Sequence, residues 1–264
     1  MNTAIKTILS LFTLMTPYEV THAQGMKLGE VIIVSTSTLK KDVRAERFEA
    51  QVTGEIAPSW NKGKSGESIH LFRADRGNRK GEFLLVCGAT KLSDRNTLSP
   101  GSPFTNTRLP DFLSNPDSYT EYHLIGTEKF KSLPTVGILG IHYIKVKPDR
   151  SNEFEKFVIE KLHPAVGKLL PDMQLLYYKA VAGENAGTYI TIFAIESPAV
   201  RDKYWPSGAP ETEILKQAFR PLNGLAAELG SYLVEGSYLE PKGGAAAYFE
   251  SREWTDFIHQ GFLK

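Results

Sequence analysis

The chain has 264 residues, of which 41% are hydrophobic and 23% charged, and its 31 Lys and Arg against 30 Asp and Glu give a formal net charge of +1. These values are ordinary for a globular protein and exclude an acidic disordered chain. The chain also lacks the basic excess with which a dedicated nucleic-acid-binding protein holds a phosphate backbone, so we expect no nucleic-acid partner.

Residues 1–23 have the pattern of a secretory signal peptide. Lys6 precedes an apolar run at residues 7–15, and the segment ends in the small residue Ala23, as signal peptidase prefers. The run is shorter than the roughly 20 residues that cross a bilayer, so we expect export to the periplasm or the medium and no membrane span. The alternative is that translation begins at Met26, which would leave the protein in the cytosol.

The two halves of the chain resemble each other. Residues 31–100 align with residues 137–206 without a gap, at a constant spacing of 106 residues. The identical pairs include apolar positions, prolines and turn glycines: Ile32/Ile138, Phe48/Phe154, Val52/Val158, Pro58/Pro164, Gly77/Gly183 and Gly81/Gly187. Past a small insertion the spacing becomes 110 residues, which pairs Tyr122 with Tyr232. Chance does not place such residues at one spacing, so we predict two copies of one module.

Each copy is predicted to fold in the order β-α-β-β-α-β. The first strand covers residues 30–38 and 136–145, which are apolar and rich in β-branched residues. The helix that follows has an apolar stripe, and Pro58 or Pro164 is expected to end or kink it. Two strands then flank a glycine-bearing loop, at residues 68–74 and 82–89 in copy one and at 174–180 and 188–195 in copy two. A second helical region follows, which is clearest at residues 211–229. A closing strand completes each module, at residues 119–127 and 231–238.

This order of elements is that of a ferredoxin-like module, an antiparallel sheet with both helices on one face. The strand at residues 136–145 is apolar on both sides, so the open sheet face also needs cover. In this the chain resembles the tandem form of the dimeric α+β barrel superfamily, over about residues 28–240. We therefore predict an α+β fold with two ferredoxin-like βαββαβ modules packed sheet to sheet as a pseudo-dimeric α+β barrel. The domains are a signal peptide (1–23), a first module (24–132), a second module (133–241) and a C-terminal tail (242–264).

Familiar catalytic and cofactor motifs are missing from the sequence. Gly63, Lys64 and Ser65 imitate the end of a phosphate-binding loop, but Pro58 stands where such a loop needs a glycine. The chain has no GxSxG, HExxH, CxxC or GxGxxG pattern, so we expect no metal site and no cofactor. The resemblance admits haem as a minor variant, which no motif supports. The single cysteine, Cys87, lies in an apolar run and is interpreted as a buried small hydrophobe.

Two histidines of the second copy have no counterpart in the first. His142 and His163 stand where the first copy has Thr36 and Ala57. A histidine on a core strand or at a helix end can act as a general acid or base, so both are candidate catalytic residues. The alternative is that each is a hydrogen-bonded structural histidine.

Aromatic side chains are the candidate ligand-binding residues, because they could line an apolar pocket between helices and sheet. They are Trp60, Tyr143, Tyr177, Tyr178 and Trp205. Tyr177 and Tyr178 are adjacent on a strand and must point to opposite faces, so only one of them can line a given cavity. The alternative is that these residues pack the core. Arg73, Arg76, Arg79 and Lys80 cluster on the first hairpin loop, which we interpret as a solvated turn, with an anion site as the alternative.

The tail after Pro241 belongs to neither copy. It begins with a glycine- and alanine-rich stretch and then carries large apolar residues: Tyr248, Phe249, Trp254, Phe257, Ile258 and Phe262. We expect it to pack back on the barrel or to dock on a neighbouring subunit and form a homo-oligomer.

These observations favour an exported protein that binds a small apolar molecule in a helix–sheet pocket. One alternative is a cofactor-independent monooxygenase-like enzyme whose site lies in the second module. Another is a structural or partner-binding protein. The sequence does not decide whether the chain is an enzyme.

Overall fold

The computed structural model describes residues 25–63, 68–77, 79–93, 107–126, 134–206, 220–234 and 255–260, and the single positions 104, 213 and 217. The predicted signal peptide and the tail residues Tyr248, Phe249, Trp254 and Phe262 lie outside this part of the chain. Among the described residues, no helix is both long enough and apolar enough to cross a membrane.

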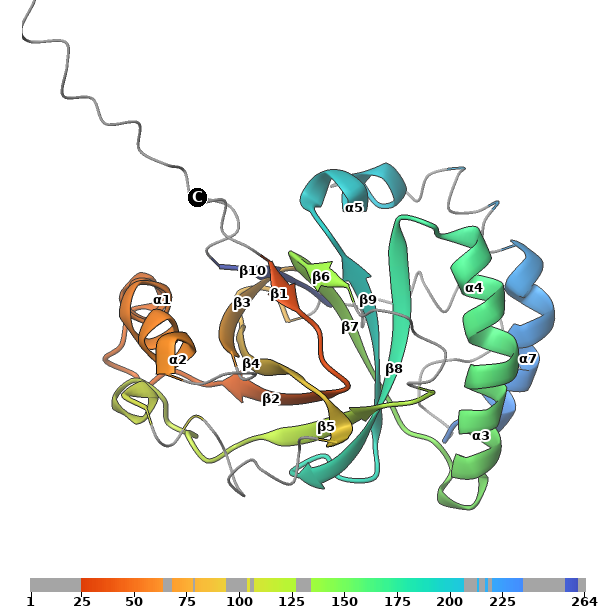
Figure 1. The fold of residues 1–264 in the computed structure, drawn as a ribbon, viewed down its shortest axis with the longest axis horizontal. Coiled ribbons are helices and arrows are strands. Elements are labelled where there is room, and N and C mark those ends of the chain that lie inside the picture. Colours follow the sequence, from red (N-terminus) through yellow and green to blue (C-terminus); the bar gives the residue numbers. More distant parts are fainter. Residues whose placement is uncertain are drawn as a thin grey trace, which may run out of the picture.

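Eight strands form a closed barrel at the centre of the molecule, in the order β10-β3-β4-β2-β5-β8-β9-β7 (Figure 1). Their bounds are β2 (Val31–Ser37), β3 (Ser68–Arg76), β4 (Phe83–Thr90), β5 (Thr120–Leu124), β7 (Ile138–Ile144), β8 (Met173–Gly183), β9 (Tyr189–Ile195) and β10 (Thr255–His259). Every neighbouring pair is antiparallel. Two short strands, β1 (Met26–Lys27) and β6 (Thr135–Val136), pair with each other outside the barrel sheet.

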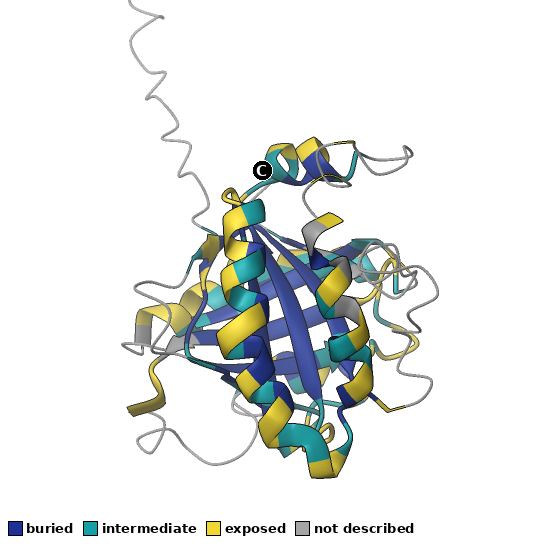
Figure 2. Cartoon of the chain, turned by 90° about the vertical axis from the view of Figure 1, so that its right-hand side faces the viewer, coloured by how far each residue is buried: buried dark blue, intermediate teal, exposed yellow. Residues whose placement is uncertain are grey.

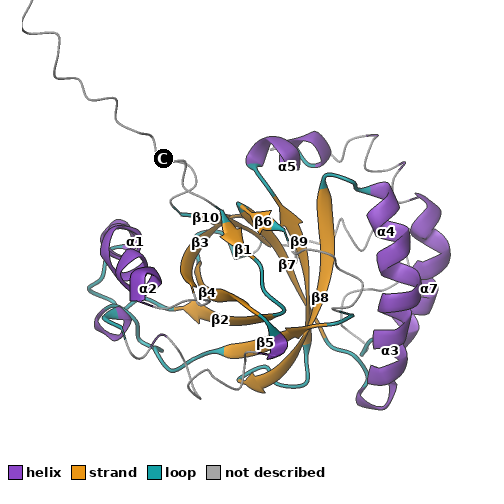
Figure 3. Ribbon diagram, in the orientation of Figure 1, coloured by secondary structure: helices purple, strands orange, loops and turns teal. Residues whose placement is uncertain are grey.

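Helices cover the barrel on two opposite sides (Figure 3). On one side lie α1 (Ala45–Gln51) and α2 (Ala57–Gly63). On the other lie α3 (Ser151–Phe157), α4 (His163–Leu169) and α7 (Asn223–Tyr232). A further helix, α5 (Pro198–Tyr204), follows β9 in the chain. In Figure 2 the helices facing the viewer show exposed residues outward and buried residues toward the strands behind them. The fold is therefore of the mixed α+β class, as predicted.

The prolines widen the long helices rather than ending them. A π-helical turn joins α1 to α2 (Val52–Ile56) and another joins α3 to α4 (Val158–Leu162). In each, the residue before the proline donates its N–H to the carbonyl five residues back, Ala57 to Val52 and His163 to Val158. Because proline lacks an N–H and clashes with the carbonyl four residues back, the wider turn lets the helix continue past it.

The core has three apolar clusters, one inside the barrel and one beneath each helical side. Along β7, Leu139 and Ile141 belong to the interior cluster, whereas Ile138 and Ile144 belong to the cluster beneath α3 and α4. All seven residues of β9 are buried, because one face lines the interior and the other faces helices. Cys87 is buried at 4% exposure, as expected.

The end of the second half differs from the prediction. Ser231 and Tyr232 belong to helix α7, so the closing strand expected at residues 231–238 was wrong for its first two positions. Tyr232 is buried, and its ring lies against Phe154 and Phe157 of α3. One edge of β7 pairs with β9, and the other pairs with β10, which comes from the predicted tail.

β10 is also the strand that closes the barrel, because its other edge pairs with β3. The described part of the tail is thus a barrel strand with neighbours on both edges. It leaves no free edge for a second copy. A homo-oligomer through the tail stays a prediction.

The 106-residue spacing of the sequence recurs in the structure. The two π-helical turns are offset by that spacing. So are the hairpin glycines with positive φ, Gly77 (92°) and Gly81 (92°) against Gly183 (88°) and Gly187 (86°). Positive φ is the conformation for which glycine was predicted at these loops. An origin by duplication stays a prediction.

Candidate functional site

The predicted site residues do not converge on one site. His142, His163 and Tyr177 lie between the sheet and the helices of the second half, whereas Tyr178 and Tyr143 belong to the barrel interior. The two tryptophans lie elsewhere, Trp60 on α2 in the first half and Trp205 directly after α5. Adjacent Tyr177 and Tyr178 do point to opposite faces, as predicted from strand geometry.

A row of polar side chains crosses the sheet beneath α3 and α4. His142 on β7 is directly opposite Thr191 on β9, and Thr191 is directly opposite Tyr177 on β8. The ring of His163, at the start of α4, lies 5.6 Å from the ring of Tyr177, centroid to centroid. The two candidate histidines therefore share one helix–sheet layer, although 21 positions separate them in the sequence.

The environment of this layer is dry. Burial lowers the pKa of His142 to about 3 and the pKa of His163 to about 4, so both imidazoles are neutral at pH 7. His142, Thr191 and Tyr177 are each 0% exposed, which means that no water-sized void lies against them. A neutral imidazole can accept a proton from a substrate, but a substrate would first have to open this layer.

The candidate aromatic residues Tyr143, Tyr178 and Trp205 each contact another residue of the chain. The hydroxyl of Tyr178 donates to the carbonyl of Gly29 at 2.8 Å, and burial raises the pKa of this phenol. The guanidinium of Arg79 lies 5.5 Å from the centre of the Tyr143 ring. The ring of Trp205 packs 5.5 Å from that of Phe193, and these contacts are typical of core packing.

The cations of the first hairpin are engaged in pairs. Arg73 contacts Glu49 at 3.5 Å, Arg76 contacts Asp202 at 2.9 Å, and Arg79 contacts Glu82 at 2.7 Å. No described group of three or more His, Cys, Asp or Glu residues could hold a metal ion.

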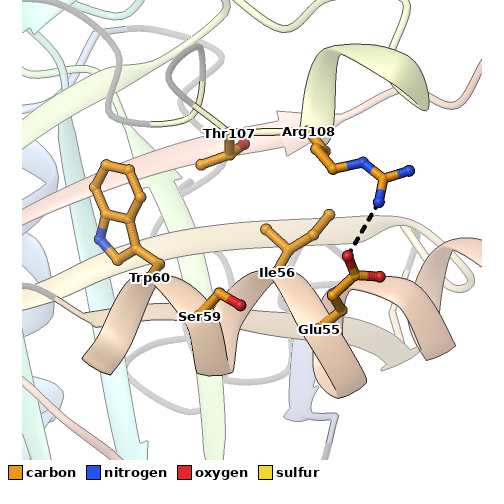
Figure 4. Close-up of a pocket in the computed structure, with 6 residues that line it drawn as sticks. All are labelled: Glu55, Ile56, Ser59, Trp60, Thr107 and Arg108. Atoms are coloured by element: carbon orange, nitrogen blue, oxygen red, sulfur yellow. Dashed lines mark hydrogen bonds and ion pairs between the residues drawn. The ribbon is translucent and has the colours of Figure 1, made fainter. Parts of the chain in front are cut away.

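Trp60 lines an open pocket of about 510 Å³ on the first half of the chain (Figure 4). Helix α2 and the π-helical turn before it supply one wall, and the segment before a short 3-10 helix (Leu109–Asp111) supplies the other. The lining residues are Glu55, Ile56, Ser59, Trp60, Thr107 and Arg108. In Figure 4 the side chains of Trp60 and Ile56 point from the helix toward Thr107 and Arg108 across the space.

The chemistry of this pocket is mixed. Ile56 is 6% exposed and, with Trp60, continues the apolar cluster beneath the helix. The Thr107 hydroxyl donates to the carbonyl of Phe104 at 2.7 Å and accepts from the N–H of Leu109 at 3.0 Å, which fixes the far wall.

An ion pair stands at one end of the pocket. The Arg108 guanidinium donates to Glu55 at 3.0 Å. Both side chains are more than half exposed, at 62% and 51%. The pocket thus has an apolar wall, two hydroxyls and one cation, which pairs with Glu55 at 3.0 Å and with Asp111 at 3.7 Å.

Sequence reasoning identified only Trp60 in this set. Ile56 and Trp60 stand four positions apart, which places both on one helix face, and that spacing could have indicated the wall. Arg108 and Thr107 belong to a connection for which no element was predicted. Their position depends on tertiary contacts, such as the ion pair of Arg108 with Glu55, and no local pattern marks it.

The strand order defines the class of fold. In each half, the second strand lies at one edge and the fourth at the other, and each fourth strand pairs with the second strand of the other half, β5 with β8 and β10 with β3. This closed barrel is consistent with the dimeric α+β barrel superfamily that the sequence resembles. The packing of two separate modules stays a prediction.

Comparison with known proteins found no matching family model and no matching curated protein. Solved structures with some similarity include a candidate monooxygenase from Fusobacterium nucleatum (11% identity, 87% of this chain and 92% of that chain, TM-score 0.46). Others are an anthrone oxidase-like protein (11%, 87% and 90%, TM-score 0.43) and a mutant chlorite dismutase from Candidatus Nitrospira defluvii (14%, 72% and 82%, TM-score 0.41). At these TM-scores the likenesses carry no argument about activity.

Proposed function

We propose that the chain binds a small, largely apolar molecule in the pocket between Trp60 and Arg108. The observation that carries this proposal is the pairing of an apolar wall with one cation in a single space of about 510 Å³. That size is within the usual range for small-molecule pockets, which combine apolar surface with a few polar groups.

The ion pair at the end of the pocket favours a ligand with an acidic group. Exposed ion pairs such as Arg108–Glu55 contribute only about 0–1 kcal/mol, so a ligand carboxylate can replace Glu55 on the guanidinium at little cost. A planar apolar body would then lie against the indole of Trp60 and the side chain of Ile56. The proposed ligand is therefore an aromatic or aliphatic carboxylate.

A pair of matched probes tests this proposal. We expect 2-naphthoate to bind with a Kd on the order of 1 mM, since a ligand of this size gains about 0.3 kcal/mol for each heavy atom. Its neutral amide, 2-naphthamide, should bind more weakly. Quenching of tryptophan fluorescence would measure both, and Trp60→Phe should remove most of the signal.

The variant Arg108→Gln should abolish the preference for the acid over the amide. Arg150→Gln is the matched control, because Arg150 forms an ion pair with Glu153 in the other half of the chain. Binding to Trp60→Ala is measured by calorimetry, because this variant lacks the fluorescent indole. If Trp60→Ala and Arg108→Gln bind both probes as the unmodified protein does, the proposed pocket is wrong.

The oxygenase-like alternative is less well supported by the packing. It would use His142 or His163 with Tyr177 next to a bound substrate. The zero exposure of His142, Thr191 and Tyr177 leaves such a substrate no space against them. A haem against His142 would meet the same obstacle, because the side chains around His142 are fully buried, so we derive no step through haem.

We also propose that residues 1–23 direct export and that the two halves are ferredoxin-like modules related by duplication. The apolar run after Lys6 supports the first proposal, and the recurrence of π-helical turns at a 106-residue spacing supports the second. Intact-mass measurement of the protein from its own host tests the first. A chain that begins at Gln24 is expected, and one that begins at Met26 would contradict export.

A further inference from the structure

Three polar side chains meet where β3 begins and β10 ends. His70 on β3 places its Nδ1 atom 2.8 Å from Nε2 of His259 on β10, although the two residues are 189 positions apart. The other ring nitrogen of His70, Nε2, lies 2.8 Å from the hydroxyl oxygen of Ser68. The result is a continuous chain of hydrogen bonds from a serine through one imidazole to a second.

The connectivity is that of a nucleophile, a base and a residue that orients the base. In serine hydrolases the serine oxygen bonds Nε2 of the base histidine, and the orienting group bonds Nδ1 of the same ring. His70 makes these two bonds with these two nitrogens, and both distances are within the range at which protons transfer.

Ser68 and His70 are less buried than His259, as expected for a nucleophile and base that are held by a buried orienting residue. Ser68 and His70 are half-buried, so part of their surface is accessible to solvent. His259 is 7% exposed, and its ring packs edge-on against Phe72 at 5.1 Å, which holds it in place.

The tautomer of His259 is free to adapt. Its Nδ1 atom is buried and has no hydrogen-bond partner in the described part of the chain. A proton on that atom therefore meets no opposing donor, and Nε2 can accept from His70.

The second half lacks this arrangement at the corresponding positions. Gln174 and Leu176 of β8 stand where β3 has Ser68 and His70, at the 106-residue spacing. Neither residue can act as nucleophile or base. The hydrogen bonds among Ser68, His70 and His259 are therefore not a feature that both halves share.

We propose that Ser68, His70 and His259 form an esterase site for small esters of carboxylic acids. Ser68 and His70 are its catalytic residues, and His259 is a positioning residue. This proposal does not depend on the pocket beside Trp60, and the two can fail separately.

The reaction balances without any further reagent. The Oγ atom of Ser68 bonds to the acyl carbon while His70 Nε2 takes the hydroxyl proton. The bond from the acyl carbon to the alcohol oxygen then breaks, and His70 returns the proton to the leaving alcohol. Water then attacks the acyl carbon while His70 Nε2 takes its proton. The bond from the acyl carbon to Oγ breaks, and His70 returns this proton to Ser68, so that one ester and one water give one carboxylic acid and one alcohol.

The pH dependence of such a site would be unusual. Burial first, and the neighbouring His259 second, lower the pKa of His70 to about 3. The base is therefore unprotonated across the neutral range, and the rate should stay flat down to about pH 4. A weak base also predicts slow turnover.

A fluorophosphonate probe and p-nitrophenyl acetate test the proposal on the full chain. Peptide mapping should place the phosphonyl adduct on Ser68, and Ser68→Ala should abolish it. His70→Gln should lower the rates of labelling and of ester hydrolysis by about 10²-fold or more. Ser118→Ala is the matched control, since the Ser118 hydroxyl also donates to a side chain on the surface, at Glu184.

The role of His259 is tested by a replacement that adds charge. His259→Glu should stabilise the protonated form of His70, so that the midpoint of the pH–rate profile moves up toward neutrality. If His70 is not the base of the reaction, the added charge will leave that midpoint where it is. Absence of an adduct on Ser68 between pH 5 and 9, or equal labelling of Ser68→Ala, would overturn the proposal even if the His259 variant fails to fold.

Discussion

Replacing Arg201 by methionine should destabilise the seam at which the barrel closes. The Arg201 side chain is 5% exposed, and its guanidinium lies 2.9 Å from Asp75, 3.2 Å from Asp202 and 3.5 Å from Asp256. Asp75 is the residue by which β3 bulges opposite β10, and Asp256 lies on β10. One cation of α5 thus contacts both strands of the seam.

The expected loss follows from the burial of these charges. Methionine keeps the apolar stem of the arginine but leaves Asp75 and Asp256 without their shared counter-charge. Removing one partner of a buried ion pair costs about 3–5 kcal/mol. Because Asp75 is 33% exposed and Arg76 stays nearby, we expect about 3 kcal/mol, which lowers Tm by about 6–12 °C in a domain of this size.

The loss should also depend on pH. Burial raises the pKa of Asp256 to about 6, above its ordinary value of 3.8, even beside Arg201. The folded state therefore holds this proton more tightly than the unfolded state, and the resulting stability is present at low pH and lost as the pH rises through about 6. Without Arg201 the charged form is disfavoured further, so the loss should be larger at pH 8 than at pH 5.

Differential scanning calorimetry at both pH values measures the effect. Arg150→Met is the control, since its pair with Glu153 is more exposed and such pairs contribute about 1 kcal/mol at most. An equal decrease in Tm for the two variants, or a larger decrease at pH 5 for Arg201→Met, would refute the reasoning.

The remaining predictions concern the interior, the closing strand and the buried groups. Tyr178→Phe leaves the Gly29 carbonyl without its donor and should cost about 1–3 kcal/mol in urea unfolding. Deleting residues 255–264 exposes the edges of β3 and β7, so size-exclusion chromatography should show dimers or aggregates, and a stable monomer would contradict the role of β10. Asp256→Asn should flatten the change in Tm between pH 5 and pH 8. Added haemin should keep the Soret band of free haemin, without the shift that ligation by His142 would give, because the side chain of His142 is fully buried.

Much of the fold could be predicted because its signals are local. The hairpin loops need glycine because their backbone has positive φ, and β9 is mostly apolar because both of its faces are covered. The prolines marked the right positions in the helices. They did not decide between an end and a kink, because a proline can terminate a helix or be accommodated by a widened turn such as those before Pro58 and Pro164.

The closing strand could not be predicted in the same way. The apolar residues around Tyr232 fit a helix end packed on Phe154 as well as a strand, and only the structure distinguishes the two. β10 has five residues and follows a stretch that looks like a linker. What defines it as a strand is the pair of open edges on β3 and β7, and these exist only once both halves have folded.

The same reasoning explains which functional groups escaped the sequence. Trp60 could be selected from the sequence because a large aromatic residue between a helix and a sheet is a common component of an apolar pocket. Arg108 could not be selected, because its role depends on the pocket wall that it faces in the structure. His70 and His259 carry no shared local pattern, and their 2.8 Å contact exists because β10 closes the barrel against β3. A residue pair created by the last strand of a closed sheet is therefore the kind of site that single-sequence reasoning is least able to find.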